Sequence, residues 1–301
     1  MEAAEARTPI GLVAGSLGSG KTTLLRKVLE QTDRRFAVLM NEFGELPIDS
    51  EVIRGRNVEI AELVGGCVCC SLTGELEAAV EEIIDRVHPE YILLEATGIA
   101  EADALVFEVE EKIPRVRLDS VVCLVDADAS IRFPSIGYAG RSQLQAADIV
   151  LINKIDLVTE AEIEAVVAQV REFNPDAAVL RTVRCAADVC VLFGLEVENR
   201  VRSLPVRGEG TFGSFAYITT APFDESRFLE AVSQLPPSVF RAKGFLRFHD
   251  GSRLFNYVAG RTELEEFPAE TTKLVFIGPK VEEDREAIEG MLRGCETQGR
   301  R

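Results

Sequence analysis

The sequence lacks the features that would place it in a membrane, outside the cell or on a nucleic acid. No run of 18 apolar residues occurs among its 301 positions, so we predict no membrane span. The first seven residues are acidic and contain no apolar core typical of a secretory signal. Acidic residues outnumber basic ones by 50 to 33, and a net charge of −17 argues against binding to phosphate backbones or anionic lipid. We expect a soluble, cytoplasmic protein that binds neither nucleic acid nor a membrane.

Disulfide bonds are not expected either, because the seven cysteines are an odd number without secretory context. Three of them, Cys67, Cys69 and Cys70, lie within four positions and follow two glycines. Clustered thiolates suit Zn²⁺, Cu(I) or a related soft ion, with a fourth ligand from elsewhere. A helix predicted just after them would lower the thiol pKa values. We predict a metal site, with buried small side chains or a redox pair as alternatives. The remaining cysteines are interpreted as core residues: Cys123, Cys185, Cys190 and Cys295.

The most specific motif lies near the start of the chain, where a short apolar run gives way to glycines and then to a helical pattern from Lys21. Gly15, Gly20, Lys21 and Thr22 fit the phosphate-binding loop G-x-x-x-x-G-K-[ST] in its strand–turn–helix context. We expect Lys21 to contact the β- and γ-phosphates and the Thr22 hydroxyl to bind Mg²⁺. Backbone N–H groups and the helix N-terminus should hold phosphate oxygens. The predicted phosphate-site residues are Gly15, Ser16, Gly18, Ser19, Gly20, Lys21, Thr22 and Thr23.

The motif Asn153-Lys154-Ile155-Asp156 predicts that the bound nucleotide carries guanine. A carboxylate at Asp156 can accept hydrogen bonds from both N1–H and N2–H₂ of guanine, and adenine offers neither. Asn153 can hold the loop and reach the base edge, while the stem of Lys154 can lie against its face. The tetrapeptide alone is common on protein surfaces. Its position at the end of a predicted strand, downstream of a phosphate-binding loop, makes it informative.

A second phosphate-site strand is predicted at 91–95, ending in Glu95 and followed by Gly98. Glu95 could hold Mg²⁺ directly or through water, and the Gly98 N–H could contact the γ-phosphate. The alternative is that Glu95 caps the next helix. Asp126 is a weaker candidate for the metal. No glutamine or arginine for activating water is evident, so we expect slow hydrolysis unless a partner, or a second subunit in a homodimer, completes the site.

Strands and helices alternate through the first two thirds of the chain, which predicts an α/β P-loop fold with a doubly wound, mostly parallel sheet. Beyond residue 205 the strands are short and separated by turns, and Asp250-Gly251 predicts a hairpin. We therefore predict a GTPase domain over 1–201 and a small α+β domain over 208–301. The expected strands are 35–40, 58–64, 91–95, 118–125, 149–152, 178–183, 211–218, 239–248, 253–258 and 272–277. The expected later helices include those near 73–87, 101 onward, 160–173, 224–234 and 282–293.

Taken together, the order of these motifs resembles the CobW family of GTPases, relatives of the urease- and hydrogenase-maturation GTPases of the SIMIBI class. The matching segments are the phosphate-binding loop, N-E-F-G-E, G-G-C-V-C-C, E-A-T-G, V-D-A, Q-L-Q-A-A-D and N-K-I-D. The segment P-P-S-V-F-R-A-K-G, from Pro236, looks like the signature of that family's C-terminal domain. The resemblance covers nearly the whole chain.

The resemblance implies a GTP-dependent metallochaperone or insertion factor that binds zinc or cobalt and delivers it to a client metalloprotein. It also implies that Glu42 lies near the cysteines, as a ligand of the transition metal or of Mg²⁺. The chain departs from the family at two points. Ala96 stands where a hydroxyl residue is usual, and the histidine-rich loop of many members is missing, which argues against metal storage.

Two other classes of function remain open at this stage. One is an assembly or signalling GTPase whose cysteine-bound zinc is only structural. The other is a P-loop kinase or ligase that uses the triphosphate in transfer chemistry, and N-K-x-D argues against it. The leading hypothesis is a slow GTPase that binds GTP, Mg²⁺ and a thiolate-bound metal whose affinity depends on the nucleotide.

Overall fold

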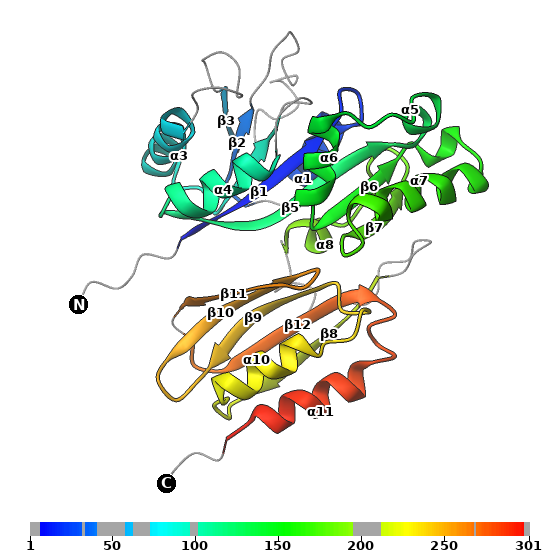
Figure 1. Cartoon of the computed structure of the whole chain (residues 1–301). Helices are drawn as coiled ribbons and strands as arrows, with labels where there is room; N and C mark the ends of the chain where they lie inside the picture. The colour runs from blue at the N-terminus through cyan, green and yellow to red at the C-terminus, as the bar shows by residue number, and fades with distance from the viewer. Residues whose placement is uncertain are drawn as a thin grey trace. The chain divides into compact units, whose positions relative to one another are not determined.

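The computed structural model describes residues 7–31, 34–40, 58–62, 73–96, 102–194, 212–267 and 269–297 (Figure 1). These residues divide into two compact units, one spanning Arg7–Phe193 and the other beginning at Gly194. The predicted domain limits at 201 and 208 stay a prediction, because residues 195–211 lie outside the described residues. Within the described ranges, no helix is long and apolar enough to cross a membrane.

The first unit is built on a seven-stranded sheet with the order β3-β2-β4-β1-β5-β6-β7. Every pairing in it is parallel. The strands β1, β2, β4, β5 and β6 are buried over nearly their whole length, as expected for a sheet covered on both faces. Their bounds are β1 Thr8–Gly15, β2 Phe36–Met40, β3 Val58–Glu62, β4 Tyr91–Glu95, β5 Val116–Asp126, β6 Ile149–Asn153 and β7 Ala178–Thr182.

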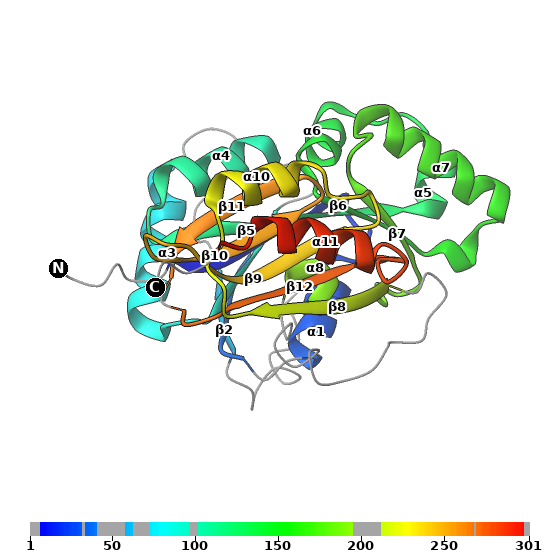
Figure 2. The ribbon, with the colours of Figure 1, turned by 90° about the horizontal axis from the view of Figure 1, so that it is seen from below.

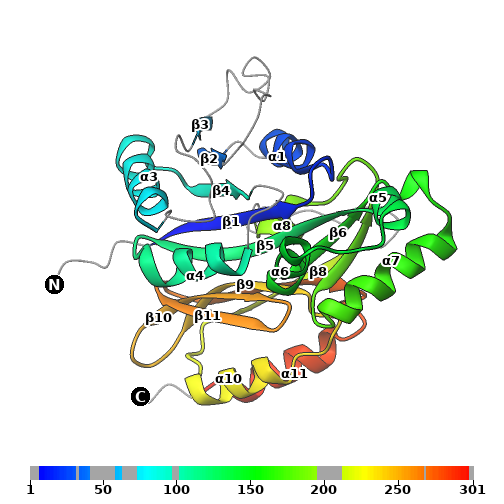
Figure 3. The ribbon, with the colours of Figure 1, turned by 45° about the horizontal axis from the view of Figure 1, so that its top comes forward.

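Helices cover both faces of this sheet, which confirms the predicted doubly wound α/β architecture. Figure 3 shows α3, α4 and α6 on one face and α1 and α8 on the other. The bounds are α1 Lys21–Glu30, α3 Thr73–Val87, α4 Ala102–Lys112, α5 Ala127–Arg132, α6 Tyr138–Ala146, α7 Glu160–Phe173 and α8 Val189–Phe193, with a 3₁₀ turn η1 at Ile155–Leu157. Thr159 begins α7 through a capping box with Glu162, a local signal that made this helix predictable.

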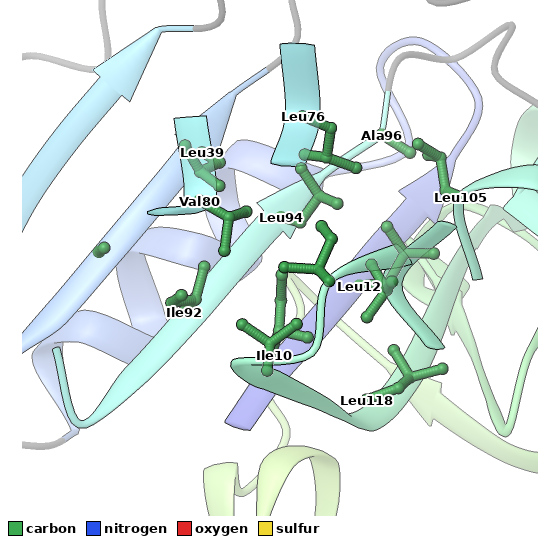
Figure 4. Close-up of a cluster of buried hydrophobic side chains, with 14 of the residues drawn as sticks. Ile10, Leu12, Leu39, Leu76, Val80, Ile92, Leu94, Ala96, Leu105 and Leu118 are labelled. Atoms are coloured by element: carbon green, nitrogen blue, oxygen red, sulfur yellow. The ribbon is translucent and has the colours of Figure 1, made fainter. Parts of the chain in front are cut away.

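The main core of this unit lies between the sheet and the helices α3 and α4 (Figure 4). Side chains from the central strands, such as Leu12 and Leu94, pack against Val80 of α3 and Leu105 of α4, and all four are at most 5% exposed. Burying each such side chain contributes roughly 1.5–3 kcal/mol. The core therefore holds β1 and β4 rigidly, so that the carboxyl ends of these two strands are fixed in position.

The strand order places the end of β1 at a topological switch point. From β1 the chain crosses to β2 on one side of the sheet, whereas β5 pairs with β1 on the other side. In open parallel sheets, ligands bind beyond the carboxyl ends of the strands at such a point, because the connections diverge there. The loop after β1 is the glycine-rich loop predicted from the sequence.

The second unit contains a five-stranded antiparallel sheet with the order β11-β10-β9-β12-β8. Two helices, α10 and α11, pack on one face of it around an aromatic core that includes Phe228, Phe255 and Phe276 (Figure 2). The bounds are β8 Phe212–Thr219, α10 Glu225–Ser233, β9 Arg241–Arg247, β10 Ser252–Val258, β11 Arg261–Glu266, β12 Thr272–Pro279 and α11 Arg285–Cys295. This is the α+β architecture predicted from the sequence.

The predicted hairpin at Asp250-Gly251 is present, since β9 and β10 pair across it and Phe248 N donates to Gly251 O at 2.8 Å. Several elements were missed, the short helix α8 among them. Strand β11 was not predicted, because its sequence is polar and lacks the apolar alternation typical of a strand. It is an edge strand that forms through its pairing with β10. The short helices α5 and α6, between β5 and β6, also had no counterpart among the predicted elements.

Candidate nucleotide-binding site

The glycine-rich loop connects β1 to α1 and adopts a backbone that only glycine accommodates well. Gly15, Gly18 and Gly20 have φ angles of 139°, 77° and 113°. A Cβ on Gly15 would lie 2.5 Å from the Leu124 carbonyl oxygen of β5. A Cβ on Gly20 would lie 2.7 Å from Asn153 Nδ2. These glycines therefore allow the loop to wrap closely against the neighbouring strands, which is the geometry that a phosphate-binding loop requires.

Lys21, the first residue of α1, has its ammonium group folded back over this loop. Its Nζ donates to the carbonyl oxygens of Gly15 at 3.0 Å and Ser16 at 3.3 Å, and the residue is only 8% exposed. A positive charge is thus concentrated at the N-terminus of a helix, where the helix dipole adds to it. An anion at this point would meet both fields, so the loop can hold a polyanion despite the acidic character of the chain.

The hydroxyl residues around the loop differ in exposure. Ser16, Thr22 and Thr23 are exposed, which leaves the Thr22 hydroxyl accessible to a metal ion beside a phosphate. Ser19 is fully buried, and its Oγ has no hydrogen-bond partner among the described residues. Hard oxygen donors of this kind fit Mg²⁺.

Asn153, at the end of β6, joins the glycine-rich loop to two later segments. Its Nδ2 donates to the Ser19 carbonyl at 2.9 Å. Its Oδ1 accepts from Thr182 Oγ1 at 3.2 Å and from Cys185 N at 2.9 Å. The side chain is 2% exposed and is therefore fixed between these partners. This first residue of N-K-I-D organises the site, while Asp156 in η1 is exposed and accessible to a ligand.

Lys154 and Asp126 form an ion pair at the same edge of the sheet, with Nζ and Oδ2 separated by 2.6 Å. The other carboxylate oxygen of Asp126 accepts from Ala129 N at 3.1 Å and caps α5. Both oxygens of Asp126 are thus engaged by protein groups. Glu95 ends β4 beside Val13 of β1 and is 6% exposed.

The segment 183–187, which follows β7, belongs to the site and was missed from the sequence. Cys185 was interpreted as a core residue, and it is indeed fully buried. Its Sγ, however, lies 3.4 Å from the Gly20 carbonyl of the phosphate-binding loop. Gln31, at the end of α1, donates to the Ala187 carbonyl at 3.3 Å. No motif reveals these contacts, because they join residues more than 150 positions apart in the chain.

The four described cysteines are buried and form no disulfide among the described residues. Burial raises the pKa of Cys123 to about 12 and the pKa values of Cys185 and Cys295 to about 11. Such thiols stay protonated at neutral pH and are poor metal ligands. No group of three or more His, Cys, Asp or Glu side chains able to hold a metal occurs in the part of the chain that the structure describes. The predicted site residues outside that part are Glu42, Cys67, Cys69, Cys70 and Gly98.

The fold and this loop define a P-loop nucleotide-binding protein with a doubly wound parallel sheet. Residues 9–181 match the CobW/HypB/UreG nucleotide-binding domain, and residues 212–296 match the cobalamin synthesis protein CobW C-terminal domain. The chain belongs to the CobW/HypB/UreG family, which confirms the resemblance stated from the sequence.

Individual relatives match over most of their length. The zinc chaperone YjiA of Escherichia coli is 30% identical, with 94% of this chain and 98% of that protein covered. The zinc chaperone CobW of a Sinorhizobium species is 28% identical, with 83% and 81% covered. The crystal structure of Zn(II)-bound YjiA GTPase from E. coli shares the fold, with a TM-score of 0.50, 23% identity and coverage of 97% and 100%.

Proposed function

We propose that this protein is a GTP-hydrolysing metallochaperone that binds zinc through Cys67, Cys69 and Cys70 and delivers it to a client metalloprotein. Relatives named zinc chaperones and the match to a nucleotide-binding family support the general activity. Cobalt is the alternative cargo. Thiolate ligands require a reducing compartment, in keeping with the cytoplasm expected from the sequence.

The observation that carries the proposal is the common edge at which the parallel strands end. β2 ends at Met40 and β3 ends at Glu62, and both run parallel to β4 and β1. β2 and β3 therefore end at the edge of the sheet where the phosphate-binding loop begins, and in the sequence Glu42 follows Met40 by two residues and Cys67 follows Glu62 by five. A nucleotide bound at the phosphate-binding loop and a metal bound by the residues that follow β2 and β3 can then influence one another.

Within the nucleotide site, the residues divide into phosphate, metal and base contacts. Lys21 compensates charge on the β- and γ-phosphates, as its buried position at the start of α1 favours. Thr22 and Glu95 would hold Mg²⁺, which supplies further positive charge to the phosphates when bound. Asp156 accepts from guanine, while Asn153 keeps the loops together. No arginine or glutamine finger is evident in the sequence, so intrinsic hydrolysis is slow.

Coupling between zinc and nucleotide distinguishes a chaperone from a GTPase with a structural metal. If a nucleotide binds two arrangements of the cysteine segment unequally, zinc affinity must change by the same factor as nucleotide affinity. A coupling of ~1–3 kcal/mol is typical of such linkage. The γ-phosphate contact of Gly98 and the Glu42 ligand are the predicted routes by which hydrolysis would release the metal.

The test is the zinc dissociation constant measured with a chromophoric competitor in the presence of GDP and of a non-hydrolysable GTP analogue. We expect the two constants to differ by about fivefold or more, because the coupling is at least ~1 kcal/mol. The triple variant Cys67→Ser, Cys69→Ser, Cys70→Ser should lose zinc binding while retaining GTP affinity. Cys190→Ala, which removes a buried thiol of α8, serves as the matched control and should retain both.

Equal zinc constants in the two nucleotide states would contradict the chaperone function. That result would favour the second candidate, an assembly or signalling GTPase with structural zinc. The wild-type protein would then lose folding stability when a chelator removes the zinc, whereas the triple variant would not respond to the chelator, and thermal unfolding with and without a chelator measures this.

A further inference from the structure

The segment after β7 makes a tight turn in a backbone conformation that is unusual for its residues. Ala186 N donates to Val183 O at 3.1 Å and closes a four-residue turn. The two central residues, Arg184 and Cys185, have φ angles of 51° and 54°. Consecutive positive φ angles are characteristic of type I′ turns, which usually contain Asn or Gly. Two residues with full side chains adopt this conformation only when surrounding contacts compensate for the strain.

Three hydrogen bonds from the nucleotide site hold the turn in place. The Cys185 backbone N–H donates to Asn153 Oδ1 at 2.9 Å, and the Cys185 thiol donates to the Gly20 carbonyl at 3.4 Å. Gln31 at the end of α1 donates to the Ala187 carbonyl at 3.3 Å. The turn is thereby attached to the N-K-I-D strand, to the phosphate-binding loop and to the helix that follows that loop.

The thiol fits closely at the centre of this junction. Cys185 is fully buried, and a Cβ on Gly20 would lie 2.9 Å from its Sγ and 2.7 Å from Asn153 Nδ2. Desolvation raises the pKa of Cys185 to about 11, so the side chain remains an S–H donor at neutral pH. The group can therefore donate to a carbonyl and fill a small space, whereas a larger side chain would displace the loop.

We propose that Cys185 is a positioning residue for guanine nucleotides, whose thiol holds the 183–187 turn against the phosphate-binding loop. A guanine nucleotide would span the phosphate-binding loop, with its phosphates at Lys21, and the N-K-I-D segment, with its base at Asp156, and the turn contacts both through Gly20 and Asn153. Because the turn is already ordered before the nucleotide binds, the spacing between these two segments is fixed, and binding does not pay the entropic cost of ordering the turn. The inference rests on the proposed GTP-binding function and adds to it a residue that no motif identifies.

The experiment compares a ligand that contacts both the phosphate-binding loop and the N-K-I-D segment with one that contacts only the phosphate-binding loop. Calorimetry with Mg²⁺ present gives affinities for GDP and for inorganic tripolyphosphate. For Cys185→Ala we expect GDP binding to weaken about fivefold, the effect of one lost neutral hydrogen bond. Tripolyphosphate binding should stay within twofold of wild type, because Lys21 and the loop glycines are unchanged. Cys185→Ser should restore GDP binding to within about twofold, since its hydroxyl can donate to the same carbonyl.

Two further variants separate positioning from folding. Cys185→Gly removes the thiol and also relieves the positive φ, so it should fold and still bind GDP more weakly. Cys295→Ala is the matched control in the other unit, where Cys295 Sγ donates to the Met291 carbonyl at 3.3 Å. It should leave GDP affinity unchanged.

The proposal is overturned if Cys185→Gly or Cys185→Ala binds GDP as wild type does. It is also overturned if GDP and tripolyphosphate weaken by the same factor, because the thiol would then merely support the phosphate loop. Either result, with normal GDP binding by the wild type, leaves the GTPase function intact. Absence of GDP binding by the wild type would instead overturn the proposed function itself.

Discussion

Asn153 joins three parts of the nucleotide site through one side chain, with its amide donating to Ser19 and accepting from Thr182 and Cys185. Its neighbour Lys154 has a positive φ of 61° and pairs with Asp126. At the scale of single residues, the site is therefore held together by polar side chains that bond to one another and to the loop backbone. Under the proposed function, Lys21 and Asp156 recognise the two ends of the nucleotide.

Replacing Lys21 by alanine should abolish nucleotide binding. Its ammonium group is buried within the phosphate-binding loop, and the chain carries a net charge of −17, so the phosphates would lose their main compensating charge. Calorimetric titration with GTP measures the effect. Arg26→Ala, which removes an exposed cation of the same helix, is the control and should bind GTP normally. Unchanged affinity in the Lys21 variant would contradict the phosphate-loop interpretation.

Replacing Asp156 by asparagine should weaken GTP by ~1–3 kcal/mol, because two guanine donors lose their acceptor and remain unpaired. Xanthosine triphosphate carries a carbonyl where guanine carries an amine, so the new amide donor should improve its binding. Competition between the two nucleotides measures this exchange of preference. If the wild-type protein binds ATP as tightly as GTP, the interpretation of N-K-I-D is wrong.

At the scale of elements, the antiparallel sheet of the second unit depends on a close approach between β9 and β12. Gly244 in β9 has a φ angle of 154°, and a Cβ there would overlap the Lys273 carbonyl oxygen. Glycine inside a strand often marks such an approach. The sequence segment that suggested the C-terminal domain thus ends on a residue that the pairing of two strands requires.

Gly244→Ala should destabilise the second unit by ~3 kcal/mol, through overpacking and backbone strain. Denaturant unfolding followed by circular dichroism measures the loss. Gly290→Ala is the opposite case, because Gly290 is exposed in α11 and a Cβ there meets no atom within 4 Å. That variant should be more stable by ~1 kcal/mol, owing to the helix propensity of alanine. Equal effects of the two substitutions would rule out the close approach.

At the scale of the whole molecule, the two units have separate hydrophobic cores, one between parallel strands and helices and one rich in aromatic residues. The nucleotide site belongs entirely to Arg7–Phe193 among the described residues. A ligand that binds only one folded unit stabilises that unit by mass action. Nucleotide should therefore act on the two units differently.

GDP at about one hundred times its dissociation constant should stabilise the first unit by ~2.7 kcal/mol. Differential scanning calorimetry should show one transition move to higher temperature while the other stays in place. In Lys21→Ala neither transition should move, and Gly244→Ala should lower only the transition that GDP leaves in place. A single transition that moves as a whole would mean that the units unfold together.

Much of the fold was predictable because its signals are local. The glycines of the phosphate-binding loop, the capping box of Thr159 and Glu162, and the apolar runs of the parallel strands each specify their own segment. Strand β11 was not predictable, because its charged residues form a strand only through pairing with β10. Periodicity reports which side of an element is buried, and it does not report which neighbour a polar edge strand will find.

By itself, the sequence determined the phosphate-binding loop, the guanine motif and the family, since each depends on residues that are contiguous or ordered along the chain. Only the tertiary structure decided that Asp126 is engaged in a cap and an ion pair, and that Cys185 lies against Gly20. The last two residues are 165 positions apart and meet because β7 and β1 end at the same edge of one sheet. A contact between distant segments leaves no local pattern in the sequence, and it forms because the order of the parallel strands places the two segments together.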